Sequence, residues 1–165
     1  MDHSLFDHIT TFVFDVDGVF TNGEVIVMEN GAFVRTMHTR DGQALVLALE
    51  AGYNIVIMTK GYSEGVRKRF EILGVKYIYD RLSEKSTTFK EFCSKLGLAK
   101  EEILYMGDDI PDLSVYPLAG IAACPADGAP ENLERAMYIT ARKGGQGCVR
   151  EVIEKVMRQQ GKWNF

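Results

Sequence analysis

Short apolar runs alternate along this sequence with longer segments whose apolar residues recur at helical spacing. The short runs fit buried strands, and the longer segments fit helices with one apolar face. This alternation predicts an α/β fold in which a parallel sheet is covered by helices on both faces. The expected strands are 10–14, 54–58, 75–78, 103–106 and 120–123, and the expected helices are 42–51, 63–73, 83–96, 131–137 and 148–160, with a short helix after Pro111.

One segment departs from the alternation. Residues 24–28 and 32–37 are two further apolar runs on either side of Asn30-Gly31, a pair that favours a tight hairpin turn. A β-hairpin outside the sheet is therefore expected. This hairpin carries more apolar side chains than a hairpin outside the sheet needs, so we expect it at subunit contacts. These apolar residues include Val25, Val27, Phe33 and Val34.

Composition narrows the class of protein. The chain has 165 residues, of which 46% are hydrophobic and 25% charged, so residues 1–165 are expected to form a single globular domain. The net charge of −4 argues against nucleic acid as the main partner. No apolar run approaches the roughly 20 residues that span a bilayer, and Met1–Ser4 do not start a signal peptide pattern. We expect a cytoplasmic protein without membrane contact.

Cysteines and histidines offer no metal pattern. Cys93, Cys124 and Cys148 lie far apart and fit no CxxC spacing, so we expect reduced thiols. The scattered residues His3, His8 and His38 are not expected to bind metal.

Polar residues gather where the predicted strands end. Asp15 and Asp17 follow the first strand, Thr59 follows 54–58, and Gly107–Asp112 supplies three more carboxylates after 103–106. Ligands of parallel sheets bind beyond these carboxyl ends. Lys85 opens a later helix, where the helix dipole disfavours a cation unless an anion is near.

These side chains suit phosphoryl transfer. So many carboxylates repel one another unless a cation holds them, and oxygen ligands favour Mg²⁺. The helix dipole alone would favour one or two acids after 103–106, but not all of them. A carboxylate nucleophile with a hydroxyl and an ammonium for phosphate oxygens fits an aspartyl-phosphate mechanism.

Four motifs in order resemble those of the haloacid dehalogenase (HAD) superfamily. A further likeness, over almost the whole chain, is to the 3-deoxy-D-manno-octulosonate 8-phosphate (KDO8P) phosphatase family, which also acts on nine-carbon sialic-type sugar acid phosphates. The HAD motifs are DVDGVFTNG (15–23), MTK (58–60), SEK (83–85) and GDDIPD (107–112), and the KDO8P likeness lies in GVFT (18–21) and KGGQGCVRE (143–151).

The resemblance assigns roles to the strand-end residues. It implies that Asp15 is the nucleophile, and that Asp17 is the general acid and then the base that activates water. Thr59 and Lys85 would bind the phosphoryl group. The implied enzyme is a Mg²⁺-dependent phosphatase of a KDO8P-type sugar acid, or of a nine-carbon sialic-type 9-phosphate.

The resemblance also implies a metal site and an assembly. Mg²⁺ would be held by Asp15, the backbone carbonyl of Asp17, and Asp108, with Asp109 and Asp112 orienting these ligands. It implies a Rossmann-like HAD fold and a homotetramer. The stretches between Asp17 and Lys85 leave no room for a cap domain. We therefore expect a neighbouring subunit to close the site, with the hairpin of 19–40 and the loop of 143–147.

The sequence departs from the family where the substrate is chosen. Thr59-Lys60-Gly61 stands where Thr-Gly and then Arg or Glu are usual, Asp80-Arg81 replaces Gln-Gly, and Thr21-Asn22-Gly23 replaces Thr-Asp-Gly. The phosphoryl chemistry is unaffected by these changes.

A sugar acid needs a cation for its carboxylate. Lys60, Arg69 and Arg81 are candidates, with Arg142 and Lys143 from a neighbour. We favour Arg69, which matches a family arginine and can pair with a carboxylate through two bonds.

Two other classes share parts of this pattern. A receiver domain has similar residues, but its lysine comes last, whereas Lys85 precedes Gly107–Asp112 here. A non-catalytic HAD-like assembly module is the other alternative, and the intact Asp15, Asp17 and Thr59 argue against it.

Overall fold

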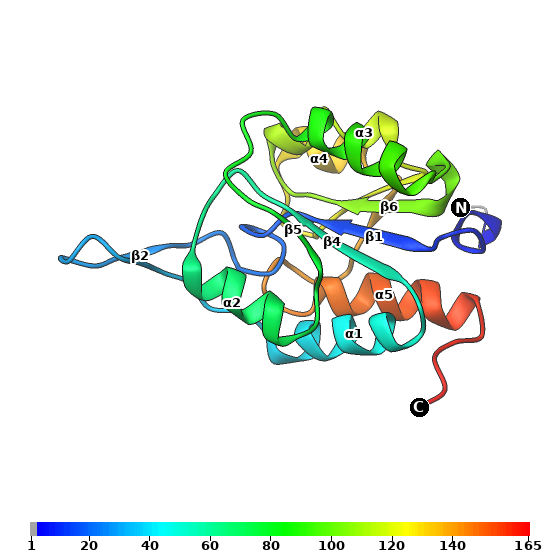
Figure 1. Ribbon diagram of the computed structural model, residues 1–165, viewed down its shortest axis with the longest axis horizontal. Helices are drawn as coiled ribbons and strands as arrows, with labels where there is room; N and C mark the ends of the chain where they lie inside the picture. The colour runs from blue at the N-terminus through cyan, green and yellow to red at the C-terminus, as the bar shows by residue number, and fades with distance from the viewer. Residues whose placement is uncertain (1–2) are drawn as a thin grey trace.

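Six parallel strands form the central sheet in the order β5-β4-β1-β6-β7-β8 (Figure 1). The computed structural model describes residues 3–165, so Met1 and Asp2, which the signal-peptide argument used, lie outside the described residues, as does the side chain of His3. The strands are β1 (Thr11–Phe14), β4 (Asn54–Met58), β5 (Tyr77–Tyr79), β6 (Ile103–Met106), β7 (Ile121–Cys124) and β8 (Tyr138–Ile139).

Helices cover both faces of the sheet and confirm the three-layer prediction. In Figure 1, α1, α2 and α5 lie on one side of the sheet, and α3 and α4 lie on the other. Four short 3₁₀ turns complete the chain, at 3–6, 100–102, 110–112 and 116–118. The helices are α1 (Thr39–Glu50), α2 (Glu64–Ile72), α3 (Lys85–Leu96), α4 (Pro130–Arg135) and α5 (Cys148–Gln159).

Strand β1 divides its side chains between two cores, because successive residues of a strand point to opposite faces. Phe12 and Phe14 are buried in the core under α1 and α5, and Val13 lies in the core under α3. The first core extends to the loop after β1. The centre of the Phe20 ring lies 5.5 Å from that of Phe14 and 4.9 Å from that of Phe70 of α2. This aromatic row fixes the loop that carries Asp15 and Asp17.

The predicted hairpin is present and projects from the body of the molecule (Figure 1). Its strands β2 (Ile26–Val27) and β3 (Phe33–Val34) pair antiparallel and are shorter than expected. Its apolar side chains face solvent in the single chain, with Val27 71% exposed and Phe33 56% exposed. No helix among residues 3–165 is long and apolar enough to cross a membrane, and no further domain covers the carboxyl edge of the sheet in that range.

Several element boundaries differ from the expected ones. Helix α1 begins at Thr39 because the Nδ1 atom of His38 accepts a hydrogen bond from the Arg40 backbone N–H and caps the helix. The predicted helix 131–137 ends at Arg135, and the chain then adds β8, whose two residues are too few to give a sequence pattern. Strand β4 matches its predicted range, and α2, α3 and α5 match theirs to within two residues at each end.

The glycine-rich segment of 144–147 packs on the loop after β1. Gly145 donates a backbone hydrogen bond to the carbonyl of Val19 at 2.9 Å, and a Cβ at Gly144 would lie 1.9 Å from the carbonyl oxygen of Gly18. Backbone cannot yield at such a contact as a flexible side chain can. Gly144 therefore permits an approach that no other residue allows.

Replacing Gly144 tests this packing. We expect Gly144→Ala to lower the free energy of unfolding by about 2 kcal/mol or more, and Tm by about 4–8 °C, because the loop must move. Gly65→Ala is the matched control, since its Cβ would meet only Ser63 Oγ at 4.0 Å. Calorimetry showing equal Tm values for the two variants would contradict the close contact.

Candidate active site

The site lies where the sheet changes its winding direction. From β1 the chain adds β4 and β5 on one side, and β6, β7 and β8 on the other. The loops after β1 and β6 therefore part at a topological switch point, the usual ligand position in such sheets. The Asp15 backbone N–H donates to the carbonyl of Met106 at 3.0 Å, which places Asp15 beside Gly107 and Asp108.

Three carboxylates converge at this point on one ammonium. Oxygen atoms of Asp15, Asp108 and Asp112 all lie within 4.8 Å of one another. The buried side chain of Lys85 opens α3 and places its Nζ 2.9 Å from Asp15 Oδ1 and 2.7 Å from Asp112 Oδ1. One positive charge thus faces three carboxylates.

Burial and mutual repulsion shift the pKa values here. Burial, followed by the charges of Asp15 and Asp112, raises the pKa of Asp108 to about 8. Burial and the charge of Asp112 also raise the pKa of Asp15, although Lys85 opposes this. Burial alone would lower the pKa of Lys85, but its ion pairs with Asp15 and Asp112 reverse this and raise it. Burial and repulsion therefore favour either a proton on Asp108 or a cation that takes its place.

Asp112 is held by a set of donors that leaves it little freedom. Its Oδ2 accepts the backbone N–H groups of Asp108 at 3.0 Å and Asp109 at 3.2 Å. Its Oδ1 accepts from Lys85 and from the buried hydroxyl of Tyr105. These contacts suit the predicted orienting role of Asp112. The sequence did not predict this contact of Tyr105, because its pattern indicates only a core residue of β6.

Asp108 offers a free oxygen toward the cluster. Its Oδ1 is buried and has no hydrogen-bond partner among the described residues, which is costly unless a ligand binds there. Asp109 instead is exposed and accepts from the Ile110 backbone N–H at 2.8 Å. Oxygen donors from Asp15 and Asp108 in a strongly negative setting fit Mg²⁺. The orienting role expected of Asp109 stays a prediction.

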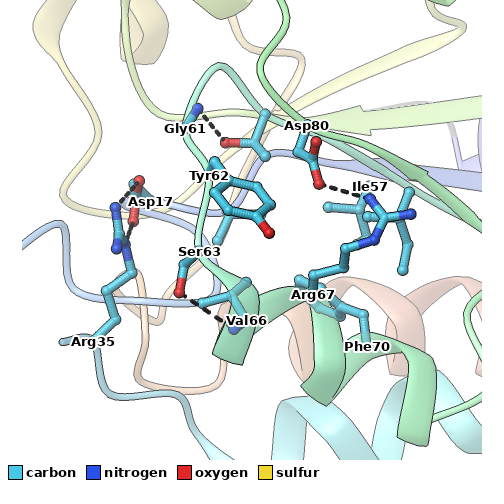
Figure 2. Close-up of a pocket in the computed structure, with 13 residues that line it drawn as sticks. Asp17, Arg35, Ile57, Gly61, Tyr62, Ser63, Val66, Arg67, Phe70 and Asp80 are labelled. Carbon is cyan, nitrogen blue, oxygen red and sulfur yellow. Dashed lines mark hydrogen bonds and ion pairs between the residues drawn. The ribbon is translucent and has the colours of Figure 1, made fainter. Parts of the chain in front are cut away.

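Asp17 is paired with an arginine that the sequence did not single out. Arg35 follows β3 and reaches back, with Nε 2.6 Å from Asp17 Oδ1 and Nη2 3.3 Å from Oδ2 (Figure 2). Its remaining amino nitrogen, Nη1, is buried and has no partner among the described residues. This contact depends on the course of the hairpin, so no local pattern predicts it.

Thr59 directly follows β4 and lies beside this pair. Its Oγ1 accepts the Gly61 backbone N–H at 3.1 Å, and its own N–H donates to Tyr79 of β5. A Cβ at Gly61 would lie 3.3 Å from Asp17 Oδ2 and 3.6 Å from Thr59 Oγ1, so Gly61 borders both residues. Lys60 is exposed. The structure thus brings Asp15, Asp17, Thr59, Lys85 and Asp108 to one edge of the sheet.

A pocket opens between this edge and the start of α2. Thr59 is among its lining residues. Figure 2 shows Asp17 and Arg35 on one side, the ion pair of Arg67 with Asp80 on the other, and Tyr62 between them. Arg67 Nη1 lies 2.7 Å from Asp80 Oδ2.

The structure does not bring Arg69 to this pocket. A Cβ at Gly42 of α1 would lie 2.8 Å from Arg69 Nη2, which puts the guanidinium beside α1. Arg69 instead lines an adjoining groove, which shares Arg35 and Tyr62 with the pocket and extends to the hairpin residues Phe33 and Val34. Any role for Arg69 at a site would therefore lie on the hairpin side of α2.

Comparison with known proteins identifies the family. No family model matches the chain. The 3-deoxy-D-manno-octulosonate 8-phosphate phosphatase KdsC of Escherichia coli K12 is 33% identical over 156 residues, which cover 94% of this chain and 83% of that protein. The chain belongs to the KDO8P phosphatase family. It is a phosphatase of the HAD superfamily, as the order of its motifs indicated.

Solved structures agree with this assignment. The Yersinia pestis KDO8P phosphatase superposes with a TM-score of 0.94 at 29% identity, covering 97% of this chain and 86% of that one. The Moraxella catarrhalis enzyme, in complex with magnesium, phosphate and KDO, superposes with a TM-score of 0.93 at 31% identity, covering 96% and 91% of the two chains. The phosphatase thus has the predicted HAD fold, and its acidic cluster matches a family whose Moraxella member holds magnesium.

Magnesium binding to the phosphatase should release protons. Because the pKa of Asp108 is raised to about 8, its carboxyl is mostly protonated at pH 7, and Mg²⁺ must displace the proton. We expect the Mg²⁺ dissociation constant to rise by up to roughly tenfold for each pH unit from 8 down to 6. Titration calorimetry in buffers of different ionisation enthalpy measures both quantities. An affinity that stays constant from pH 8 to 6, with no proton release, would contradict the assigned site.

Proposed function

We propose that this phosphatase hydrolyses a sugar-acid phosphate of the KDO8P type through an aspartyl-phosphate on Asp15. The observation that supports this most is the position of Asp15, whose carboxylate meets Lys85 and Asp108 at the switch point of the sheet. The relatives named above as KDO8P phosphatases support the substrate class.

The first half-reaction follows from the contacts of Asp15. Lys85 holds Oδ1, so the other carboxylate oxygen attacks phosphorus and forms a new P–O bond as the ester P–O bond breaks. The sugar oxygen leaves with a proton from Asp17. The third N–H of Lys85 and the Thr59 hydroxyl bind phosphoryl oxygens. Mg²⁺, when bound, offsets the negative charge of the carboxylates and the phosphoryl group.

The second half-reaction regenerates the enzyme. Asp17, now ionised, takes a proton from water, and the water oxygen attacks phosphorus and displaces the Asp15 carboxylate. Arg35 occupies both oxygens of Asp17 in the structure. Asp17 must therefore leave this ion pair and take up a proton from solvent before it reaches the sugar oxygen. The proton that it later takes from water returns to solvent when Asp17 pairs with Arg35 again.

Removing the nucleophile tests the mechanism. Asp15→Asn should lower kcat by at least about 10³-fold, because an amide does not attack phosphorus, while circular dichroism shows an intact fold. Glu101→Gln, a change of the same size at an exposed carboxylate, should leave kcat unchanged. Near-normal turnover by folded Asp15→Asn would exclude covalent catalysis by this residue.

We infer that the enzyme is a homotetramer whose subunits meet through the hairpin. The exposed apolar side chains of β2 and β3 support this, because monomers rarely present so continuous an apolar surface. Contact between subunits would also cover an active site that this chain leaves open. The free cysteines fit a reducing compartment, and we place the enzyme in the cytoplasm.

Charge on the hairpin should dissociate this assembly. We expect Val27→Glu combined with Phe33→Glu to yield monomers, because burying two carboxylates in an apolar interface is unfavourable. Ile72→Glu is the control, since Ile72 is 69% exposed on α2 and away from the hairpin. Light scattering that shows a monomeric wild-type protein, or a tetrameric double variant, would contradict this interface.

A further inference from the structure

Arg81 has an unusual backbone conformation beside the active site. Its φ of 54° lies in the left-handed region, and it is the only residue other than glycine with positive φ in the part of the chain that the structure describes. Such a conformation is unfavourable for a residue with a Cβ, and it persists where surrounding contacts hold it. Asp80-Arg81 stands where the family has Gln-Gly, and glycine would adopt this conformation here without strain.

Two hydrogen bonds tie Arg81 to the strand end that carries Thr59. The Arg81 backbone N–H donates to the carbonyl of Gly61 at 3.2 Å, and the next N–H, of Leu82, donates to the carbonyl of Thr59 at 3.2 Å. Gly61 has no side chain to fill the space between these residues. Arg81 therefore stands at the rim of the phosphoryl site, on the loop that leads to Lys85.

The exposed side chain of Arg81 stacks on an aromatic ring that lines the pocket. Its guanidinium carbon lies 3.6 Å from the centre of the Tyr62 ring, a cation–π contact. Figure 2 shows Tyr62 between the start of α2 and the end of β5, facing the pocket. A guanidinium stacked on a ring keeps its plane, and its N–H donors point outward along that plane.

The charge of Arg81 is not neutralised by its neighbours. The adjacent carboxylate, Asp80, is taken by Arg67 at 2.7 Å. Among residues 3–165, no side chain forms an ion pair or a hydrogen bond with the Arg81 guanidinium within this chain. The rim thus holds one oriented guanidinium whose donors are unused.

The other cations near the pocket are less suited to bind an anion there. Arg35 is engaged by Asp17, and Arg67 by Asp80 and Glu71. Lys60 is exposed, as Arg81 is, but no ion pair or cation–π contact orients it among residues 3–165, and Arg69 lies beside α1.

We propose that Arg81 binds the carboxylate of the sugar-acid substrate, with Tyr62 as the platform that orients its guanidinium. A planar guanidinium with free donors matches a carboxylate through two parallel hydrogen bonds. The proposal rests on the proposed function, because it concerns the second anionic group of that substrate. It places the choice of substrate on the loop between β5 and α3.

Arg81→Gly tests the proposal, because glycine adopts positive φ without strain. We expect kcat/KM for KDO 8-phosphate, divided by kcat/KM for p-nitrophenyl phosphate, to fall about 10- to 100-fold, the range of charged hydrogen bonds. The loss should lie mainly in KM, and Tm should stay constant or rise. Tyr62→Leu should lower the ratio less, because the cation stays but loses its platform. Lys68→Ala, an exposed cation of α2, is the matched control and should leave the ratio unchanged.

The outcomes separate this proposal from the proposed function. A wild-type enzyme that hydrolyses the aryl phosphate but not the sugar-acid phosphate would overturn both. A wild-type preference for the sugar-acid phosphate that survives in Arg81→Gly would overturn the role of Arg81 alone. The role of Arg81 would also be overturned if Arg69→Ala, but not Arg81→Gly, lost the preference. It would be overturned as well if Arg81→Gly lowered kcat/KM equally for both substrates.

Discussion

The active site depends on a buried ammonium, that of Lys85, placed between Asp15 and Asp112. Strands β1 and β6 deliver carboxylates to one point because they lie side by side and both end there. In a buried setting these groups repel one another, and a single lysine cannot neutralise all of them. The remaining deficit of positive charge, together with the unpartnered oxygen of Asp108, makes the site favourable for a divalent cation and for transfer of an anionic group.

The rest of the fold supports this arrangement from three sides. The aromatic row of Phe14, Phe20 and Phe70 fixes the loop after β1 from the face of the sheet that α1 and α5 cover. The glycine-rich segment before α5 packs on the backbone of the same loop. The hairpin returns Arg35 to Asp17, so the element expected to join subunits also holds the proton donor. The hairpin would thereby connect the proposed assembly with catalysis.

The layers of the fold and the class of reaction could be predicted from the sequence, but many side-chain contacts of the site could not. Alternating strands and helices require a parallel sheet, and parallel strands bring their carboxyl ends together, so Asp15 and Asp108 could be placed near each other. The two residues of β8 are too few to show a pattern. Arg69 was favoured from the sequence, but which residue of α2 reaches the pocket depends on helical phase, because neighbours on a helix differ by about 100°. Helix α2 turns Arg67, not Arg69, toward the pocket. The Arg35 contact and the φ of Arg81 are tertiary features that no local signal predicts.

The central claim is that Asp15 carries the phosphoryl group during turnover. Asp17→Asn with p-nitrophenyl phosphate and Mg²⁺ tests it most directly, because nitrophenolate leaves without a proton while the water step lacks its base. After acid quenching, peptide mass spectrometry should find one phosphoryl group per chain on the peptide that contains Asp15. Release of nitrophenolate with Asp15 unmodified, or with the phosphoryl group on another residue, would contradict the account.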